Sequence, residues 1–267
     1  MDQLNKKVSQ KYGSVWSRDE TILALYLYCQ IPFAKTKQTN PSVNRLAHLI
    51  DRTPSAVARK LGNLGAFDER LAEKGVSGLK HHSKQDALIW NEFSQNWEAL
   101  VDESLSILSK LEEPRSRLPE RDSSFDTILK PPSRTEKPTI TLARVGQDFF
   151  RRTVLASHDF KCCICGLDLA ELLIASHIIP WSVRTETRLD PCNGIALCTL
   201  HDKSFDRGLL SITPDYTIRI AGKVNSSRSD FVKQAIIEFE GFTIKLPSRF
   251  TPNIEFLAWH LENVFLG

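Results

Sequence analysis

The sequence predicts an α+β chain with a helical N-terminal half and a C-terminal half that mixes short strands with helices. Helix-capping signals and apolar residues at helical spacing recur over residues 14–112. Five of the chain's 13 prolines fall within residues 113–139, and short apolar runs separated by turn sequences follow. We therefore expect a helical domain over residues 1–112, a proline-rich linker over 113–139 and a second domain over 140–267.

The composition is that of a globular protein with little excess charge. The 267 residues, 41% of them hydrophobic and 25% charged, suffice for two modest domains. The formal net charge is only +3, so a surface for nucleic acid has to be local. No apolar run approaches the ~20 residues that cross a bilayer, and the first residues lack the apolar stretch of a signal peptide. We expect a cytoplasmic protein that does not bind membranes.

Three helix starts are visible in the first half of the chain. Ser17 and Glu20 have the spacing of a capping box, and an apolar run over residues 22–28 follows. Asn40 and Thr53 each precede a proline, which is the pattern of an N-cap before a first-turn proline. We expect two short helices after Asn40 and Thr53, with apolar residues at helical spacing in both.

A further, long helix is expected from about Lys84. Aromatic residues and leucines recur at near-heptad spacing through Leu111. This stripe favours burial against the first helices. A dimer seam is the alternative, although sustained charge pairing beside the stripe is absent.

The two short helices, joined by residues 51–53, resemble a helix-turn-helix. The second helix would then expose Ser55, Arg59, Lys60 and Asn63, whose side chains can hydrogen-bond phosphates or base edges. A plain helical hairpin with a solvated basic face is the alternative. We expect DNA contact at Arg59, Lys60 and Asn63.

The second domain opens with another helix, near residues 144–155. Phe149 and Phe150 would face inward, while Arg144, Gln147 and Arg151 would face outward. The outward residues form either a solvated helix face or contacts to phosphates.

Three more elements are expected towards the C-terminus. Two apolar runs on either side of residues 213–215 predict a hairpin, and residues 238–246 suggest a further strand. Thr251, followed by a proline, predicts the start of a final helix.

Between these elements, three polar residues stand in a strand–loop–strand–helix context. His177 ends an apolar run, Asn193 lies in a turn before a second run, and His201 opens a short helix that ends at Gly208. Histidine can act as a base near neutral pH, and its ring nitrogens can bind a divalent ion. Hydrolysis of a phosphodiester needs an activated water and stabilisation of the charge on the phosphate. The order of residues indicates such a site.

Residues 144–212 resemble the HNH family of endonucleases, in the branch of bacterial restriction endonucleases. The matching segments are CCICG at 162–166, ASHIIPW at 175–181, RLDP at 188–191, NG at 193–194 and LHDKSFDRG at 200–208. The resemblance implies a C-terminal ββα-metal HNH domain behind the helix-turn-helix-like domain. It also implies a metal-dependent DNA endonuclease of a restriction or defence type.

The resemblance implies a role for each residue of the motif. His177 would be the general base. Asn193 would organise the loop and would belong to both the catalytic residues and the metal site. His201 would be the metal ligand on the helix, with Mg²⁺ or Mn²⁺ as the ion. Cleavage would leave a 5′ phosphate and a 3′ hydroxyl.

One departure from the family pattern affects the metal ligands. Many members have Asp or His immediately before the base, where this chain has Ser176. Asp202 or Asp206 can compensate. The distance along the chain from Asn193 to the helix is also one residue short of the commoner pattern, so Asp202 is an alternative to His201.

The cysteines raise the question of a second metal. Cys162-x-x-Cys165 and Cys198-x-x-His201 have the spacing of zinc ligands, and a structural Zn²⁺ would staple this region. His201 cannot readily serve zinc and a catalytic ion at once, and Cys192 is a substitute fourth ligand. Buried, unpaired cysteines are the alternative. Disulfides are disfavoured in a reducing compartment.

The leading hypothesis is thus a metal-dependent endonuclease that acts on double-stranded DNA, modified or unmodified. Cutting both strands usually needs two sites, so we also consider a homodimer. A non-catalytic DNA-binding regulator with a degenerate or zinc-stapled HNH fold is the main alternative. An RNA-cutting toxin is a third hypothesis, although no RNA-binding signature is visible.

Overall fold

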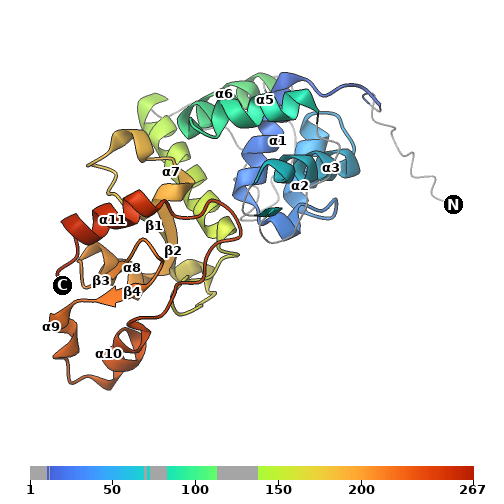
Figure 1. Ribbon diagram of the computed structural model, residues 1–267. Helices are drawn as coiled ribbons and strands as arrows, with labels where there is room; N and C mark the ends of the chain where they lie inside the picture. The colour runs from blue at the N-terminus through green and yellow to red at the C-terminus, as the bar shows by residue number, and fades with distance from the viewer. Residues whose placement is uncertain (1–10, 12, 69–70, 73–82, 113–137) are drawn as a thin grey trace. The chain divides into compact units, whose positions relative to one another are not determined.

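The computed structural model describes residues 11, 13–68, 71–72, 83–112 and 138–267. Helices dominate it and two small strand pairs accompany them, which confirms the α+β class (Figure 1). The chain divides into two compact units, Met1–Val145 and Gly146–Gly267. The expected linker lies outside the described residues apart from residues 138–139, which begin helix α7 (Pro138–Ser157). No helix in the described parts is both long and apolar enough to span a membrane.

The first unit is built around one buried helix. Helix α1 (Arg18–Gln30) is buried from Glu20 to Gln30, because the other helices of the unit pack around it. These helices are α2 (Pro41–Leu49), α3 (Pro54–Leu64), α5 (Lys84–Phe93) and α6 (Trp97–Glu112), with short 3₁₀ turns at Phe33–Lys35 and Gly65–Phe67. Ser17, Asn40 and Thr53 cap their helices as the sequence predicts.

The long helix expected from Lys84 is two helices, so that prediction was wrong. The helix is interrupted at residues 94–96. There the Asn96 Oδ1 accepts the N–H of Ala99 at 3.1 Å, which starts α6. An asparagine that caps a new helix explains the interruption. The apolar stripe is nevertheless buried within the unit, as Phe93, Trp97 and Leu100 illustrate.

The second unit has a ββα arrangement at its centre. Strands β1 (Leu173–His177) and β2 (Gly194–Cys198) pair antiparallel, with His177 opposite Gly194. Helix α8 (Thr199–Asp206) follows β2 directly. The remaining elements are β3 (Leu210–Ile212), β4 (Ile218–Ile220), α9 (Gly222–Asn225), α10 (Asp230–Ala235) and α11 (Ile254–Asn263), with 3₁₀ turns at Ala170–Leu172, Thr185–Thr187, Pro191–Asn193 and Ile237–Phe239.

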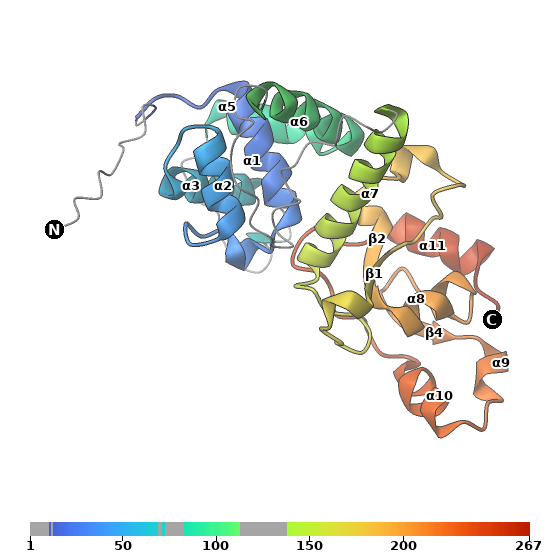
Figure 2. The ribbon, with the colours of Figure 1, turned by 180° about the vertical axis from the view of Figure 1, so that it is seen from behind.

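Helix α7 runs beside the β1–β2 pair in both views (Figures 1 and 2). A glycine makes this approach possible. A Cβ atom on Gly194 would lie 2.4 Å from Cγ2 of Val154 and 2.8 Å from Cζ of Phe150, both on α7. Any larger residue at position 194 would therefore push the helix away from the strand that pairs with His177.

The C-terminal elements agree with the sequence in part. Strands β3 and β4 form the expected hairpin. The strand expected over residues 238–246 was wrong: this part of the chain begins in a 3₁₀ turn and contributes a single bridge between Thr217 and Thr243. Helix α11 is capped by Asn253, two residues after the expected cap Thr251, because Asn253 Oδ1 accepts the N–H of Glu255 at 2.8 Å.

His260 of α11 links three elements of the second unit. Its ring stacks on Phe205 of α8 at 3.6 Å, and its Nδ1 lies 2.9 Å from Oγ of Ser211 on β3. Burial lowers the pKa of His260 from 6.5 to about 4. Between these values the unfolded chain binds a proton that the folded chain refuses, so stability is fully present above pH 6.5 and is lost as the pH falls towards 4.

We therefore expect His260→Gln to flatten the pH dependence of unfolding. One pKa unit corresponds to about 1.4 kcal/mol. Over this range the wild type should therefore lose roughly 3 kcal/mol more unfolding free energy than the variant. Denaturant titrations of both proteins between pH 4 and 7 measure it. Parallel curves for the two proteins would show that His260 titrates normally in the folded state.

Candidate active site and metal centre

His177 is held in one orientation at the end of β1. Its ring lies flat on Phe150 at 3.8 Å and meets the edge of Trp181 at 5.7 Å. Its Nε2–H donates to the carbonyl of Arg188 at 3.0 Å, which leaves the lone pair on Nδ1. Burial lowers the pKa of His177, while the hydrogen bond to Arg188 and the charge of Asp206 oppose this. A neutral imidazole with a defined basic nitrogen results.

Asn193 fixes the loop that carries Arg188, whose carbonyl accepts the hydrogen bond from His177. Its side chain is fully buried, Oδ1 accepts the N–H of Ile179 at 2.8 Å, and Nδ2 donates to the carbonyls of Ile179 and Thr187. This matches the organising role that the family resemblance implies. It does not match the expectation of Asn193 as a metal ligand, because its oxygen is used inside the loop.

Two carboxylates of α8 stand next to the end of β1. Asp202 and Asp206 are one helical turn apart and therefore share a face of the helix. Burial raises the pKa of Asp202; the Ser176 hydroxyl opposes this, and the charge of Asp206 adds to it. Asp206 in turn acts on His177. Asp202 therefore lies beside Ser176, and Asp206 is near enough to His177 for its charge to act on the ring.

These residues fit a divalent cation. The Ser176 oxygen is buried beside Asp202 and makes no well-formed hydrogen bond with any described residue. Like charges close together raise a carboxyl pKa, and a cation between them relieves that repulsion. Carboxylate and hydroxyl oxygens suit Mg²⁺ and Mn²⁺. Asp202, Asp206 and Ser176 are therefore the residues that would hold such an ion.

His201 faces a different neighbourhood from Asp202. Its Nδ1 lies 3.2 Å from Sγ of Cys198 and 3.5 Å from Sγ of Cys162. Its Nε2–H donates to the carbonyl of Ala235 at 2.9 Å. The expectation that His201 binds the catalytic ion is therefore corrected, because both ring nitrogens are engaged elsewhere; Asp202, not His201, lies beside Ser176 of β1.

Four residues form a separate cluster of metal-binding type. One ligand atom each from Cys162, Cys165, Cys198 and His201 lies within 4.8 Å of the others. None of the six cysteines, all of which lie in the described parts of the chain, forms a disulfide, and Cys192 is not in the cluster. Hydrogen bonds from Cys198 and His201 lower the pKa of the Cys162 thiol, which favours the thiolate. Thiolates with a histidine whose other nitrogen is hydrogen-bonded are the donors of structural zinc sites.

The comparison with known families covers this region. Residues 162–213 match the family model described as HNH endonuclease. The chain thus contains a domain of the HNH endonuclease family. The match spans the cysteine cluster, β1, β2 and α8. No curated protein matches the chain significantly.

A cavity of about 480 Å³ opens at His177 of the HNH domain. Gln147 and Arg151 of α7 line it, together with Phe150 and Trp181. Two of the three residues expected to contact DNA from α7 thus line the cavity at His177, whereas Arg144 is exposed and does not line it. The contacts of Phe150 and Trp181 with His177 were not anticipated, since aromatic residues in the sequence indicate only burial.

The α3 residues expected to bind DNA have different surroundings. Arg59 is exposed, and Asn63 is half-buried. Lys60 is buried and forms an ion pair with Asp86 of α5, so the expectation of an exposed Lys60 was wrong. A lysine that neutralises a buried carboxylate is not available to a phosphate unless that pair breaks.

Proposed function

We propose that the chain is a metal-dependent DNA endonuclease whose HNH domain hydrolyses phosphodiester bonds. One observation carries the proposal: His177, with its lone pair fixed on Nδ1, shares the end of β1 with the carboxylates of Asp202 and Asp206. A base and an acidic ligand set side by side are what hydrolysis of a phosphodiester requires.

In this mechanism His177 takes a proton from the attacking water at Nδ1. The Arg188 carbonyl, which accepts the Nε2–H, stabilises the positive charge that the ring acquires. Asn193 acts indirectly, because it holds the loop that places this carbonyl. The stack on Phe150 prevents the ring from turning away.

Asp202, Asp206 and Ser176 would hold the divalent cation. Mg²⁺ or Mn²⁺ bound there supplies stabilisation of the negative charge that grows on the phosphate and on the leaving oxygen. Arg151 and Gln147 line the cavity at His177 and would orient the phosphate next to it. The products would be a 5′ phosphate and a 3′ hydroxyl.

The cysteine cluster would hold a structural zinc ion. Cys162, Cys165, Cys198 and His201 come from the start of the matched region and from the β2–α8 junction. A metal there would tie α8 to the preceding segment, and so fix the helix that carries Asp202.

The substrate would be double-stranded DNA, in a restriction or defence role within the cytoplasm. Arg144 on α7, with Arg59 and Asn63 on the helix-turn-helix-like pair α2–α3, would add contacts to DNA. Two copies of the chain would cut the two strands of a duplex.

A plasmid assay tests the proposal. Supercoiled DNA is incubated with the full chain and Mg²⁺, Mn²⁺ or Ni²⁺, and with EDTA as the metal-free arm. We expect nicking with a divalent ion and none with EDTA. Asp202→Ala and Asp206→Ala should each lower the rate by about 10- to 100-fold, or demand more metal, which is the usual effect of damaging a metal site.

Lys203→Ala is the matched control, since Lys203 is exposed on the same helix. It should cut within a few-fold of the wild type. If the wild type binds DNA but cuts neither DNA nor RNA with any ion, the chain is a DNA-binding regulator. Cleavage of RNA alone would indicate a ribonuclease.

A further inference from the structure

The first unit contains a cavity that the endonuclease site does not use. Its volume is about 500 Å³. Helix α3 contributes Ser55, Arg59, Lys60 and Asn63 to its lining, and Trp16 and Arg52 also line it. This is the volume of a site for a small organic molecule and exceeds what a single ion fills.

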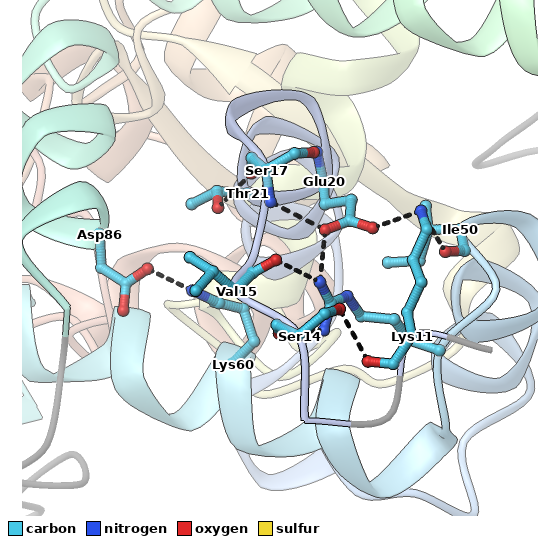
Figure 3. A network of polar contacts seen from close by, with 10 residues as sticks. Lys11, Ser14, Val15, Ser17, Glu20, Thr21, Ile50, Lys60 and Asp86 are labelled. Carbon is cyan, nitrogen blue, oxygen red and sulfur yellow. Dashed lines mark hydrogen bonds and ion pairs between the residues drawn. The ribbon is translucent and has the colours of Figure 1, made fainter. Parts of the chain in front are cut away.

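Ion pairs connect the segments that form the cavity wall (Figure 3). The Glu20 carboxylate receives Arg52 at 2.8 Å and Lys11 at 2.7 Å. Burial alone would raise the pKa of Glu20, but hydrogen bonds from Arg52, Lys11 and the Ser17 N–H together lower it. Arg52 also donates to the carbonyls of Ser14 and Val15, which fixes the segment in front of α1.

The cavity also has an aromatic element. The guanidinium of Arg52 lies 4.5 Å from the ring centre of Trp16, and Lys60 Nζ lies 4.7 Å from it. A cation over an indole ring is stabilised by the ring's electron density. The Trp16 ring thus contacts the cation of each of the two buried ion pairs, Arg52–Glu20 and Lys60–Asp86.

The charge of the lining favours an anion. Lys11, Arg52, Arg59 and Lys60 line the cavity, whereas the carboxylates in or directly behind it, among the described residues, are Asp86 and Glu20. Two positive charges therefore remain in excess. Arg59 is exposed and makes no hydrogen bond or ion pair with a described residue, so its five N–H donors are available to a ligand.

We propose that this cavity binds a single nucleotide, with Arg59 on the phosphate and the polar side chains of α3 on the base. A phosphate matches the excess charge, and a base matches the remaining volume and the hydrogen-bonding groups of Ser55 and Asn63. The favoured source is a nucleotide turned out of duplex DNA, which rests on the proposed action on DNA. A free nucleotide is the other source of the same chemistry.

The shape of the site favours entry of one nucleotide over insertion of α3 into a groove. Ser55, Arg59 and Asn63 are spaced by four residues and lie along one face of α3. That face lines a cavity that Trp16 and Ser83 also border. A recognition helix that reads a groove presents such a face as a projecting ridge.

Binding to three probes tests the proposal. The full chain, without added divalent ion, is titrated with a short duplex that carries one extrahelical 2-aminopurine nucleotide, with the same duplex fully paired, and with free dAMP. An unpaired nucleotide avoids the unpairing cost of a few kcal/mol. We therefore expect the bulged duplex to bind about 10-fold more tightly or better, with a change in 2-aminopurine fluorescence on entry.

Arg59→Ala and Ser55→Trp should abolish that preference, the first by removing the anion contact and the second by filling the cavity. Both residues are exposed, so the fold should be unaffected. Lys84→Ala, an exposed lysine of the same unit outside the cavity, should keep the preference.

Each outcome separates this site from the endonuclease. Binding of dAMP that depends on Arg59, without preference for the bulged duplex, would support the nucleotide site and overturn its source in DNA. Equal binding of both duplexes by all variants, with no dAMP binding, would overturn the site even if plasmids are cut. A bulge preference in a chain that cuts no DNA would keep the site and refute the endonuclease.

Discussion

His177→Ala is expected to abolish DNA cleavage while DNA binding persists. The histidine is the only basic group that the structure places at the end of β1 with a free lone pair on a fixed nitrogen, among the described residues of the site. Loss of a general base costs typically 10²- to 10⁴-fold in rate. Single-turnover nicking of a plasmid in Mg²⁺ or Mn²⁺ measures it.

The control must separate lost chemistry from lost structure. Alanine leaves a gap against Phe150, so His177→Gln, which fills more of that space, serves as a second variant. Both variants should keep the thermal unfolding and DNA affinity of the wild type. Added imidazole should restore part of the activity of His177→Ala, because a small base can enter the vacated position. Undiminished cleavage by both variants would move the base to another residue.

Cys162→Ser is expected to remove the zinc ion proposed for the HNH domain and, with it, most of that domain's stability. Structural zinc contributes on the order of 10 kcal/mol to the folding of small zinc domains, and a serine oxygen is a poor replacement for a thiolate. Elemental analysis of the purified wild type should find zinc in equimolar amount. Hydrogen exchange of the full chain should show β1, β2 and α8 unprotected in the variant, with α1 still protected.

Cys192→Ser is the matched control for this prediction. Cys192 belongs to the same unit but lies outside the cluster. This variant should retain the zinc and the exchange protection of the wild type. A wild type that contains no zinc, and whose unfolding is unchanged by zinc chelators, would mean that the four residues are ordinary buried side chains.

Much of the fold follows from local signals in the sequence. Ser17, Asn40 and Thr53 are helix caps because their side chains satisfy nearby backbone N–H groups, and such contacts need no distant partner. Strands β1 and β2 also follow from a local pattern, because two apolar runs are separated by turn residues. Asn96, the cap that divides α5 from α6, was a visible signal of the same kind, but the continuous apolar stripe concealed it.

The parts that the sequence left undecided depend on partners far along the chain. The sequence predicts that Lys60 is a surface cation. Only the fold places Asp86, 26 residues away, in contact with it. His201 and Asp202 are equally plausible ligands in the sequence, because neighbours on a helix differ by about 100° in direction. Only the positions of Cys162 and Ser176 decide between them.

The separation of His201 and Asp202 has a consequence for which ions the two proposed metal sites would select. His201 of the helix faces the sulfur atoms of Cys162, Cys165 and Cys198, whereas Asp202 and Asp206 of the same helix offer hard oxygen donors. Zinc prefers the first set, whereas magnesium and manganese prefer the second. If both proposed sites hold their ions, two adjacent residues of one short helix would serve ions of different hardness, and zinc at the cysteines would not displace the ion proposed for catalysis.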